Sequence, residues 1–354
     1  EKLTMSGLEV EHILKTESIK GGLKSLVVGH VLTIEKHPGA DKLNKTTVDI
    51  GNGTILNIVC GAPNVDAGQK VIVAPVGTVL YSDEGSFEIK KAKIRGEASE
   101  GMICGEDEIG LGSDKSGIMV LDSSLTPGTP LTDIYKVETD HQLEIAIIPN
   151  RGDAISHMGV ARELQALTGE KYRKPSIESI DARGQMRVDV TIADAKATPR
   201  YSGITITGVE IKESPDWLKK RLQSIDLKPI NNVVDITNFV QHEIGQPLHA
   251  FDYSRLSGNK IVARYAKQGE KLTTLDEVER ELTEKHLIIA DADKPLALAG
   301  VLGGIDSGVT SSTSTIFIES AYFNPAAVRK TAKSFGLNTD ASYRFEGGTD
   351  PEMV

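Results

Sequence analysis

Between residues 23 and 138 the chain alternates short apolar runs with breaks that contain glycine. Runs of this length, rich in valine and isoleucine, are typical of β-strands. The expected strands lie within SLVVGHVLTIEKH (25–37), KTTVDIG (45–51), TILNIVCGA (54–62), KVIVAPVGTVL (70–80), EIKKAKIRG (88–96) and GIMVL (117–121). A small oligonucleotide-binding (OB) type barrel has about five such strands, but this fold serves many functions. The pattern therefore predicts a small β-barrel without saying what it binds.

Beyond Glu144 the pattern changes, and helical periodicity begins. Ser156 is a suitable N-cap for a helix, and Gly169 is a suitable residue to end it. The apolar positions between them recur every three residues, at Met158, Ala161, Leu164 and Leu167. This spacing predicts a helix with one apolar face.

Two further helices are predicted from their starting residues. One has Ser214 as its N-cap and Pro215 at its first position. Another has Asn324 before Pro325 and ends near Gly336. Strands are expected between the helices, within RVDVTIA (187–193), GITITGVEI (203–211), KIVARYA (260–266), LIIAD (287–291) and TIFIESA (315–321). The whole chain therefore predicts an α+β multidomain protein, in which a small OB-type β-barrel precedes a larger mixed α/β domain.

Composition narrows the class of protein. With 354 residues, the chain is long enough for more than one domain. It is 39% hydrophobic and 25% charged, no apolar run approaches the roughly 18 residues of a membrane span, and no secretory signal layout begins the chain. We therefore expect a cytoplasmic protein with no membrane partner. Its net charge of -10 argues against indiscriminate nucleic-acid binding, so any RNA contact should be local.

Two cysteines, Cys60 and Cys104, form no CxxC pair and have no histidine at zinc-ligand spacing. The sequence therefore predicts neither a disulfide framework nor a metal site. The glycine cluster ALAGVLGGIDSGV (297–309) lacks the G-x-G-x-x-G spacing of dinucleotide-binding proteins. Its glycines fit either a turn with little steric demand or a backbone that approaches a ligand closely.

Three other features each have a structural and a functional interpretation. The basic run KKAKIR could contact phosphates or form a solvated strand surface; its charged residues are Lys90, Lys91, Lys93 and Arg95. His249, in GQPLHAFD, could be a structural histidine or serve a nearby reaction. Glu319, in IFIESAY, is a carboxylate among apolar neighbours, which is costly to bury unless it is hydrogen-bonded or functional.

Longer motifs indicate a family. HPGADKLNKTTVDIG, IVCGAPNVDAGQKVIVAPVG and KIRGEASEGMIC resemble the tRNA-binding barrel of the bacterial phenylalanyl-tRNA synthetase β subunit. PNRGDAISHMGVARELQALTG, NNVVDITNFVQHEIGQPLHAFD, LALAGVLGGIDSGV, IFIESAYFNP and SYRFEGGTDP resemble the editing region of the same subunit, in its order. On this resemblance, residues 1–22 are the remnant of an N-terminal domain, 23–138 the tRNA-binding OB domain, and 139–354 the editing domain with an exit segment.

Two positions depart from the family pattern. Where the family reads LDG-x-ER this chain has LDEVER, which places Glu277 at a turn glycine. Where the family reads RFERG this chain has RFEGG, which places Gly347 at an arginine. The first departure lies near the expected editing pocket, and the second concerns the exit segment.

In the family, this region hydrolyses tyrosine that has been wrongly attached to phenylalanine tRNA. The resemblance implies that His249, Thr237 and Asn238 are catalytic and that Glu319 reads the phenol hydroxyl of tyrosine. It adds Pro247, Ala299 and Gly300 to the substrate site, and it implies no metal there. The complete family enzyme is an α2β2 tetramer that uses ATP and Mg²⁺, with its synthetic site in the α subunit.

Two other functions are weighed against editing. The chain could be a tRNA-binding or scaffold module whose editing pocket is inactive, and Glu277 favours this interpretation slightly. It could also be a small-molecule enzyme built on the glycine cluster, which would bind a nucleotide cofactor. Hydrolysis of mischarged tRNA would separate the first from editing, and a thermal-shift screen with NAD and ATP would test the second.

Overall fold

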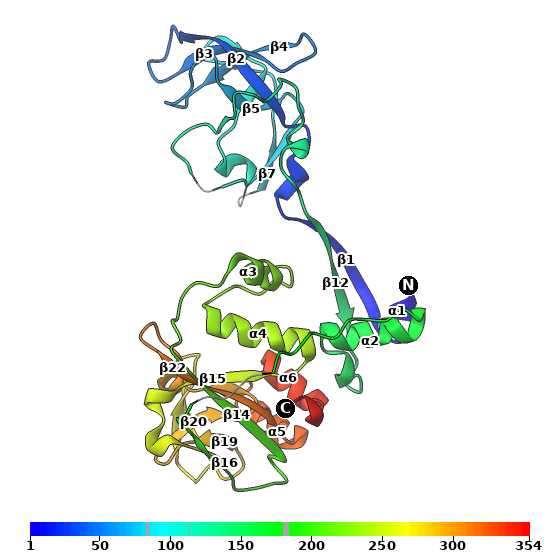
Figure 1. The fold of residues 1–354 in the computed structure, drawn as a ribbon, viewed down its shortest axis with the longest axis vertical. Helices are drawn as coiled ribbons and strands as arrows, with labels where there is room; N and C mark the ends of the chain where they lie inside the picture. The colour runs from blue at the N-terminus through cyan, green and yellow to red at the C-terminus, as the bar shows by residue number, and fades with distance from the viewer. Residues whose placement is uncertain (83–84, 113, 180–183) are drawn as a thin grey trace. The chain divides into compact units, whose positions relative to one another are not determined.

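The computed structural model describes residues 1–82, 85–112, 114–179 and 184–354 (Figure 1). The chain forms two compact units, one made of Ile13–Gln142 and the other of Glu1–His12 together with Leu143–Val354. The short helix α1 (Lys2–Met5) begins the chain. Strands β1 (Glu9–Glu17) and β12 (Thr139–Ala146) pair in a two-stranded sheet. The domain boundaries expected from sequence remain a prediction.

The smaller unit is a nearly closed β-barrel, as the run of short apolar segments predicts. Its sheet has the order β10-β5-β2-β3-β4, with β11 also paired to β5. These strands are β2 (Val27–Lys36), β3 (Asn44–Asp49), β4 (Ile55–Cys60), β5 (Lys70–Pro75), β10 (Gly101–Ile103) and β11 (Val120–Leu121). The amide of Glu100 donates to the carbonyl of Asn57 at 2.8 Å and so joins the two ends of the sheet.

Two hairpins extend from the barrel, β6 (Val79–Ser82) with β7 (Gly85–Glu88) and β8 (Ala92–Ile94) with β9 (Glu97–Ser99). Alternate residues of β3 are buried, including Val48, whereas four consecutive residues of the central strand β5, Val71 to Ala74, are buried. Cys60 and Cys104 are free and buried, as expected of small apolar side chains.

In the larger unit, two sheets share one apolar core. A three-stranded antiparallel sheet has the order β14-β22-β15, and a five-stranded sheet has the order β13-β16-β19-β20-β21. The first contains β14 (Arg200–Thr207), β15 (Leu248–Asp252) and β22 (Thr315–Tyr322). The second contains β13 (Asp189–Ile192), β16 (Lys260–Tyr265), β19 (Leu287–Ala290), β20 (Pro295–Leu298) and β21 (Leu302–Gly303). A separate hairpin joins β17 (Lys271–Thr273) to β18 (Glu279–Glu281).

The core between these sheets is made of side chains from both. Phe251 and Phe317 come from the three-stranded sheet, and Ile261 and Ile289 come from the five-stranded sheet. All four are at most 2% exposed. The mixed α/β architecture predicted for this part of the chain is therefore confirmed.

Besides α1, the described part of this unit contains the helices α2 (His157–Thr168), α3 (Asp216–Gln223), α4 (Asn232–Ile244), α5 (Pro325–Ser334) and α6 (Asp340–Gly347). Helix α4 packs against β15, and α3 packs against α4 (Figure 1). Asn231 caps α4 by accepting from the amides of Val233 and Val234. Because this cap and Gly245 define both ends of α4, they also determine where the chain enters β15.

The predicted caps are confirmed for two helices and wrong for one. Ser156 accepts from the amide of Gly159 at the start of α2, and Asn324 caps α5 ahead of its first residue. Helix α3, however, begins at Asp216 with Pro215 as N-cap, and Ser214 lies outside it. The hydroxyl of Ser214 donates instead to the carboxylate of the fully buried Asp235, at 2.5 Å. A buried carboxylate needs such donors, and this long-range requirement outweighs the local capping preference.

Candidate functional site

Strand β22 lies at the centre of its sheet and carries Glu319. On one side Glu319 is opposite Gly203 of β14, and on the other side it is opposite His249 of β15. Residues directly opposite each other on paired strands project to the same face. Phe317 and Ala321, two positions away on β22, belong to the apolar core, so Glu319 is on the core-facing side. The register thus brings together the two residues that sequence analysis considered separately.

Glu319 is a nearly buried acid, with only 8% of its surface exposed. Burial raises the pKa of its carboxyl to about 7, although a hydrogen bond from Tyr201 acts in the opposite direction. The Tyr201 hydroxyl donates to Oε2 of Glu319 at 2.5 Å. Burial and the neighbouring carboxylate raise the pKa of Tyr201 well above its ordinary value. Sequence analysis missed Tyr201, because only the pairing of β14 with β22 brings it near the acid.

His249 presents a neutral imidazole. Burial lowers the pKa of its ring to about 4, so the ring carries no charge at neutral pH. The ring lies edge-on to Phe251, with 4.5 Å between centroids and 77° between planes. Its Nε2 is buried and has no hydrogen-bond partner among the described residues. An unpaired buried ring nitrogen is unusual in a structural histidine, because buried polar atoms are normally hydrogen-bonded.

Gly303 is the glycine that faces His249. A Cβ added to Gly303 would lie 2.5 Å from Cε1 and 3.0 Å from Nε2 of His249, closer than real side-chain contacts. Gly300 has a different environment. Its φ is +67°, and an added Cβ would lie 2.9 Å from Phe345 and 3.0 Å from Phe323. Gly300 therefore allows a left-handed turn against the core, whereas Gly303 leaves space for the imidazole.

The remaining residues expected at the site come from α4 and from two turns. Thr237 is buried on α4 and donates its hydroxyl to the carbonyl of Val234 at 2.8 Å, within its own helix. Asn238 follows it and is half-buried. Pro247 is buried just before β15, and Ala299 is 1% exposed within the core. Within the described chain, no hydrogen bond joins Thr237 or Asn238 to His249 or Glu319, so α4 places them through its packing against β15.

The turn between β17 and β18 contacts the glycine cluster (297–309). The amide of Leu275 donates to the carbonyl of Gly303 at 3.0 Å, and Thr274 bridges to Gly304. Glu277 lies in this tip with φ +62°, a left-handed conformation that favours glycine. The family glycine that Glu277 replaces therefore corresponds to a strained position in this chain.

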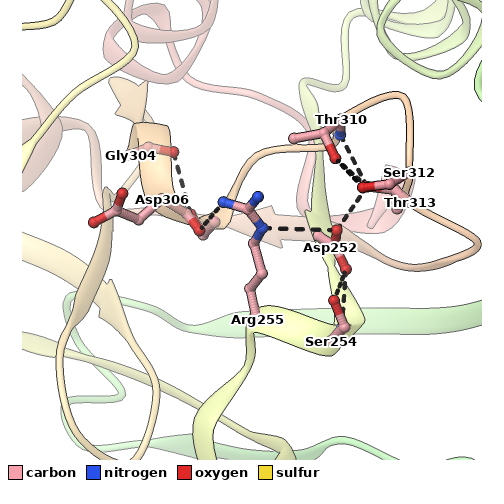
Figure 2. A network of polar contacts seen from close by, with 9 residues as sticks. Asp252, Ser254, Arg255, Gly304, Asp306, Thr310, Ser312 and Thr313 are labelled. Carbon is pink, nitrogen blue, oxygen red and sulfur yellow. Dashed lines mark hydrogen bonds and ion pairs between the residues drawn. The ribbon is translucent and has the colours of Figure 1, made fainter.

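A polar network holds the C-terminal end of the glycine cluster and the residues just after it (Figure 2). Asp252 is 4% exposed and ends β15. Its carboxylate accepts from the amide and hydroxyl of Ser254, at 2.9 and 2.6 Å, and from the hydroxyl of Thr313 at 2.6 Å. Arg255 lies 3.8 Å from the same carboxylate and donates to the carbonyl of Asp306 at 3.0 Å. The network ties the segment after Gly303 to the strand that carries His249.

The basic residues expected to contact RNA lie around β8 in the barrel. Lys90 lines a cleft of about 600 Å³ whose wall also includes Glu108, the pKa of which is raised by burial. Lys91 pairs with the partly exposed Glu100 at 2.7 Å, and Arg95 donates to the carbonyl of Gly39 at 3.3 Å. Lys93 is exposed on β8. These cations therefore differ in how freely they can meet a phosphate.

The sequence predicts neither a metal site nor a membrane span. No group of three or more His, Cys, Asp or Glu side chains is arranged to hold a metal ion within the described ranges. In the same part of the chain, no helix is long and apolar enough to cross a membrane.

Models of two protein domains match separate parts of this chain, one in each compact unit. Residues 26–130 match the model of the putative tRNA binding domain, and residues 197–354 match the model of the B3/4 domain. The chain is 50% identical over 358 residues to the phenylalanine–tRNA ligase beta subunit of Bacteroides thetaiotaomicron, a match that covers 99% of this chain and 44% of the relative. It is 51% identical over 360 residues to the same subunit of Porphyromonas gingivalis, covering 100% of this chain and 44% of the relative.

A solved structure with a partial match is an N-terminal fragment of the phenylalanyl-tRNA synthetase beta subunit from Pyrococcus horikoshii. It has 17% identity and a TM-score of 0.32, and the match covers 55% of this chain and 60% of that one. The chain spans less than half the length of the curated relatives described above. The two domain matches and the identity of about one half over the whole chain confirm the resemblance seen in its motifs. The chain belongs to the phenylalanine–tRNA ligase beta subunit family.

Proposed function

We propose that this chain binds phenylalanine tRNA and hydrolyses tyrosine that has been wrongly attached to it. The observation that carries the proposal is the register of β15 and β22, which places His249 directly opposite Glu319 on one face. One is a neutral imidazole with an unpaired Nε2, and the other is an acid whose charge is finely balanced near neutral pH. Such paired, perturbed groups are typical of functional sites.

Glu319 would distinguish tyrosine from phenylalanine. The two amino acids differ by one hydroxyl, and an apolar synthetic pocket rejects that addition only modestly, so a second hydrolytic site increases accuracy. A phenol entering this site would donate to the carboxylate of Glu319, whereas phenylalanine would leave the buried acid without that donor. The selectivity therefore runs in the direction that editing needs.

His249 would act at the ester that joins the amino acid to the terminal ribose. Its free Nε2 can accept a hydrogen bond from a water, which attacks the ester carbonyl carbon while the bond to the ribose oxygen breaks. The products are tyrosine and intact tRNA. Thr237 and Asn238 would help orient that water or the α-amino group, and Pro247 and Ala299 would shape the wall beside them. Gly303, rather than Gly300, leaves the space in which the imidazole can work.

The complete protein would be a larger assembly. In it, this family's β subunit pairs with an α subunit in an α2β2 enzyme that uses ATP and Mg²⁺ to attach phenylalanine, with the synthetic site in the α subunit. The barrel would contribute tRNA contacts through Lys90, Lys91, Lys93 and Arg95. The match to a putative tRNA binding domain supports this assignment for the barrel.

The decisive experiment incubates the chain with Tyr-tRNA and Phe-tRNA, both made with phenylalanine tRNA, and follows amino-acid release. We expect faster release of tyrosine, with the preference lost in Glu319→Ala and the rate lowered in His249→Ala. If the isolated chain is silent, the same assay is run on an α2β2 enzyme that carries this sequence. Silence there would reject editing and favour a tRNA-binding scaffold.

A further inference from the structure

Tyr201 is a partly buried residue that is hydrogen-bonded to Glu319 and has no part in editing as proposed above. They lie diagonally across the pairing of β14 with β22, since Tyr201 is opposite Ala321 and Glu319 is opposite Gly203. Diagonal neighbours on one face are within reach of a long aromatic side chain. The ring of Tyr201 packs against the apolar core, and its hydroxyl donates to Oε2 at 2.5 Å. Hydrogen bonds to a charged oxygen are characteristically this short.

The pair leaves half of the carboxylate for another donor. Each carboxylate oxygen can accept independently, and Tyr201 is bonded to Oε2 alone. A carboxylate can rotate about its terminal bond when nothing holds it, and then its second oxygen has no fixed direction. The bond from Tyr201 removes that freedom, because the tyrosine ring is itself held by core side chains.

We propose that Tyr201 is a positioning residue, which holds Oε2 of Glu319 so that Oε1 is presented as a carboxylate oxygen to the phenol of a mischarged tyrosine. This inference rests on the proposed editing function. It assigns to the protein's own phenol the task of preparing the acid for the phenol of the substrate. A charged acceptor left unpaired costs more than a neutral one, so keeping Glu319 ionised increases the penalty for phenylalanine.

Few groups can compete with Tyr201 for control of this acid. From β14 the titratable neighbour is Tyr201, and from β15 it is His249, which is neutral at pH 7. Along β22 the same-face neighbours Phe317 and Ala321 are apolar. The pKa of Glu319 is raised by burial and lowered by Tyr201. Loss of the phenol should therefore leave the acid protonated over a wider range of pH.

The test compares wild type with Tyr201→Phe, which keeps the ring and removes the hydroxyl. Release of tyrosine and phenylalanine from mischarged and correctly charged tRNA is measured between pH 5.5 and 9, in the complete enzyme. We expect the ratio of the two kcat/KM values to fall about tenfold at pH 7. We also expect the pH at which selectivity is half-maximal to rise by about one unit. A purely structural role would not move that pH profile.

Two controls make the result specific. Tyr322→Phe removes a hydroxyl from β22, the strand of Glu319, on the face opposite that acid. This variant should leave the ratio of the two kcat/KM values and the pH profile unchanged. Tyr201→Phe in a Glu319→Gln background should add no further loss, because Tyr201 acts through the carboxylate. Infrared titration of the carboxyl band, compared with Glu319→Gln, follows the protonation of Glu319 without any tRNA and should show the same upward shift.

The outcomes separate the two proposals. If wild type prefers tyrosine and Tyr201→Phe is unchanged, Tyr201 has no positioning role while editing stands. If Tyr201→Phe binds the tyrosyl ester more tightly or becomes more selective, the phenol competes with the substrate and the inference is overturned. If the complete wild-type enzyme releases neither amino acid, editing itself fails, and the role of Tyr201 fails with it.

Discussion

A Cβ on Gly303 would lie 2.5 Å from Cε1 of His249. The imidazole keeps its position only because residue 303 has no side chain. The glycine cluster of the sequence thus has one member that faces the histidine and another, Gly300, that turns against the core.

Gly303→Ala should displace the His249 ring. We expect a loss of roughly 1–3 kcal/mol in the free energy of unfolding, as for an overpacked core, and a fall of about tenfold or more in tyrosine release, as for a misplaced catalytic group. Gly308→Ala is the matched control, because its φ is -72° and the nearest atom to an added Cβ is 3.7 Å away. Urea unfolding and the release assay together decide the matter. Equal behaviour of the two variants would show that residue 303 does not hold the imidazole in place.

Glu319 should make stability depend on pH. Its pKa is about 7 in the folded chain, against an ordinary value of 4.5 for a solvated glutamate, so the folded state binds the proton more tightly. The contribution of Glu319 to the free energy of unfolding is therefore fully present below about pH 4.5 and is lost as pH rises through about 7. The whole change is about 3 kcal/mol. Glu319→Gln should remove this loss, so that its free energy of unfolding relative to wild type increases between pH 4.5 and 8.

His249 should act with the opposite sign. Its pKa is lowered to about 4, so its contribution is present above the ordinary value of 6.5 and is lost as pH falls toward 4. Between about pH 4.5 and 6.5, rising pH increases the free energy of unfolding through His249 and decreases it through Glu319. In His249→Asn the free energy of unfolding, measured at several pH values, should therefore fall more steeply with rising pH in this window than in wild type. A parallel curve would mean that the ring is not buried as a neutral imidazole.

Glu277→Gly should stabilise the chain. The residue has φ +62°, which costs a non-glycine residue roughly 1–2 kcal/mol. Part of that gain is offset by the greater freedom of glycine when unfolded, so we expect an increase of about 0.5–1 kcal/mol. Glu279→Gly, two residues along in β18, should destabilise instead, because that residue has strand geometry and pairs with Lys271 at 2.7 Å. Thermal unfolding of the two variants gives the comparison.

Asp252→Ala should loosen the segment after Gly303. It would leave the hydroxyls of Thr313 and Ser254 without their buried acceptor, at a cost of about 2–3 kcal/mol. The control Asp306→Ala removes an exposed carboxylate in the same segment. Its contact with Lys294 is long, at 4.0 Å, so the substitution should cost little free energy of unfolding. Hydrogen exchange of residues 304–313 should accelerate in the first variant only.

Removing cations from the barrel should weaken tRNA binding in a salt-dependent way. If Lys90 and Lys93 contact phosphates, replacing both by alanine should reduce the slope of log K against log salt by about 2. Lys91→Ala serves as comparison, since Lys91 is already paired with Glu100. Filter binding across a salt series measures each slope, and an unchanged slope in the double variant would place the RNA contacts elsewhere.

Much of the local structure could be predicted from sequence because its causes are local. Ser156 and Asn324 cap helices through bonds to amides two or three residues away. Ser214 was mispredicted for the opposite reason, since its hydroxyl is used by Asp235, 21 residues along the chain. Glu277 was recognised through the family pattern, and its positive φ gives that departure a physical meaning.

By itself, the sequence determined most of the strand and helix pattern, the barrel, the family and the residue types of the candidate site. Tertiary structure alone decided that His249 is opposite Glu319, that Tyr201 donates a hydrogen bond to that acid, and that Gly303 leaves room for the imidazole. Strand register brings His249 and Tyr201 to Glu319 from 70 and 118 positions away in the sequence, which no local pattern specifies. Burial by the shared core then shifts both pKa values toward the uncharged forms, because charge is costly where water is excluded.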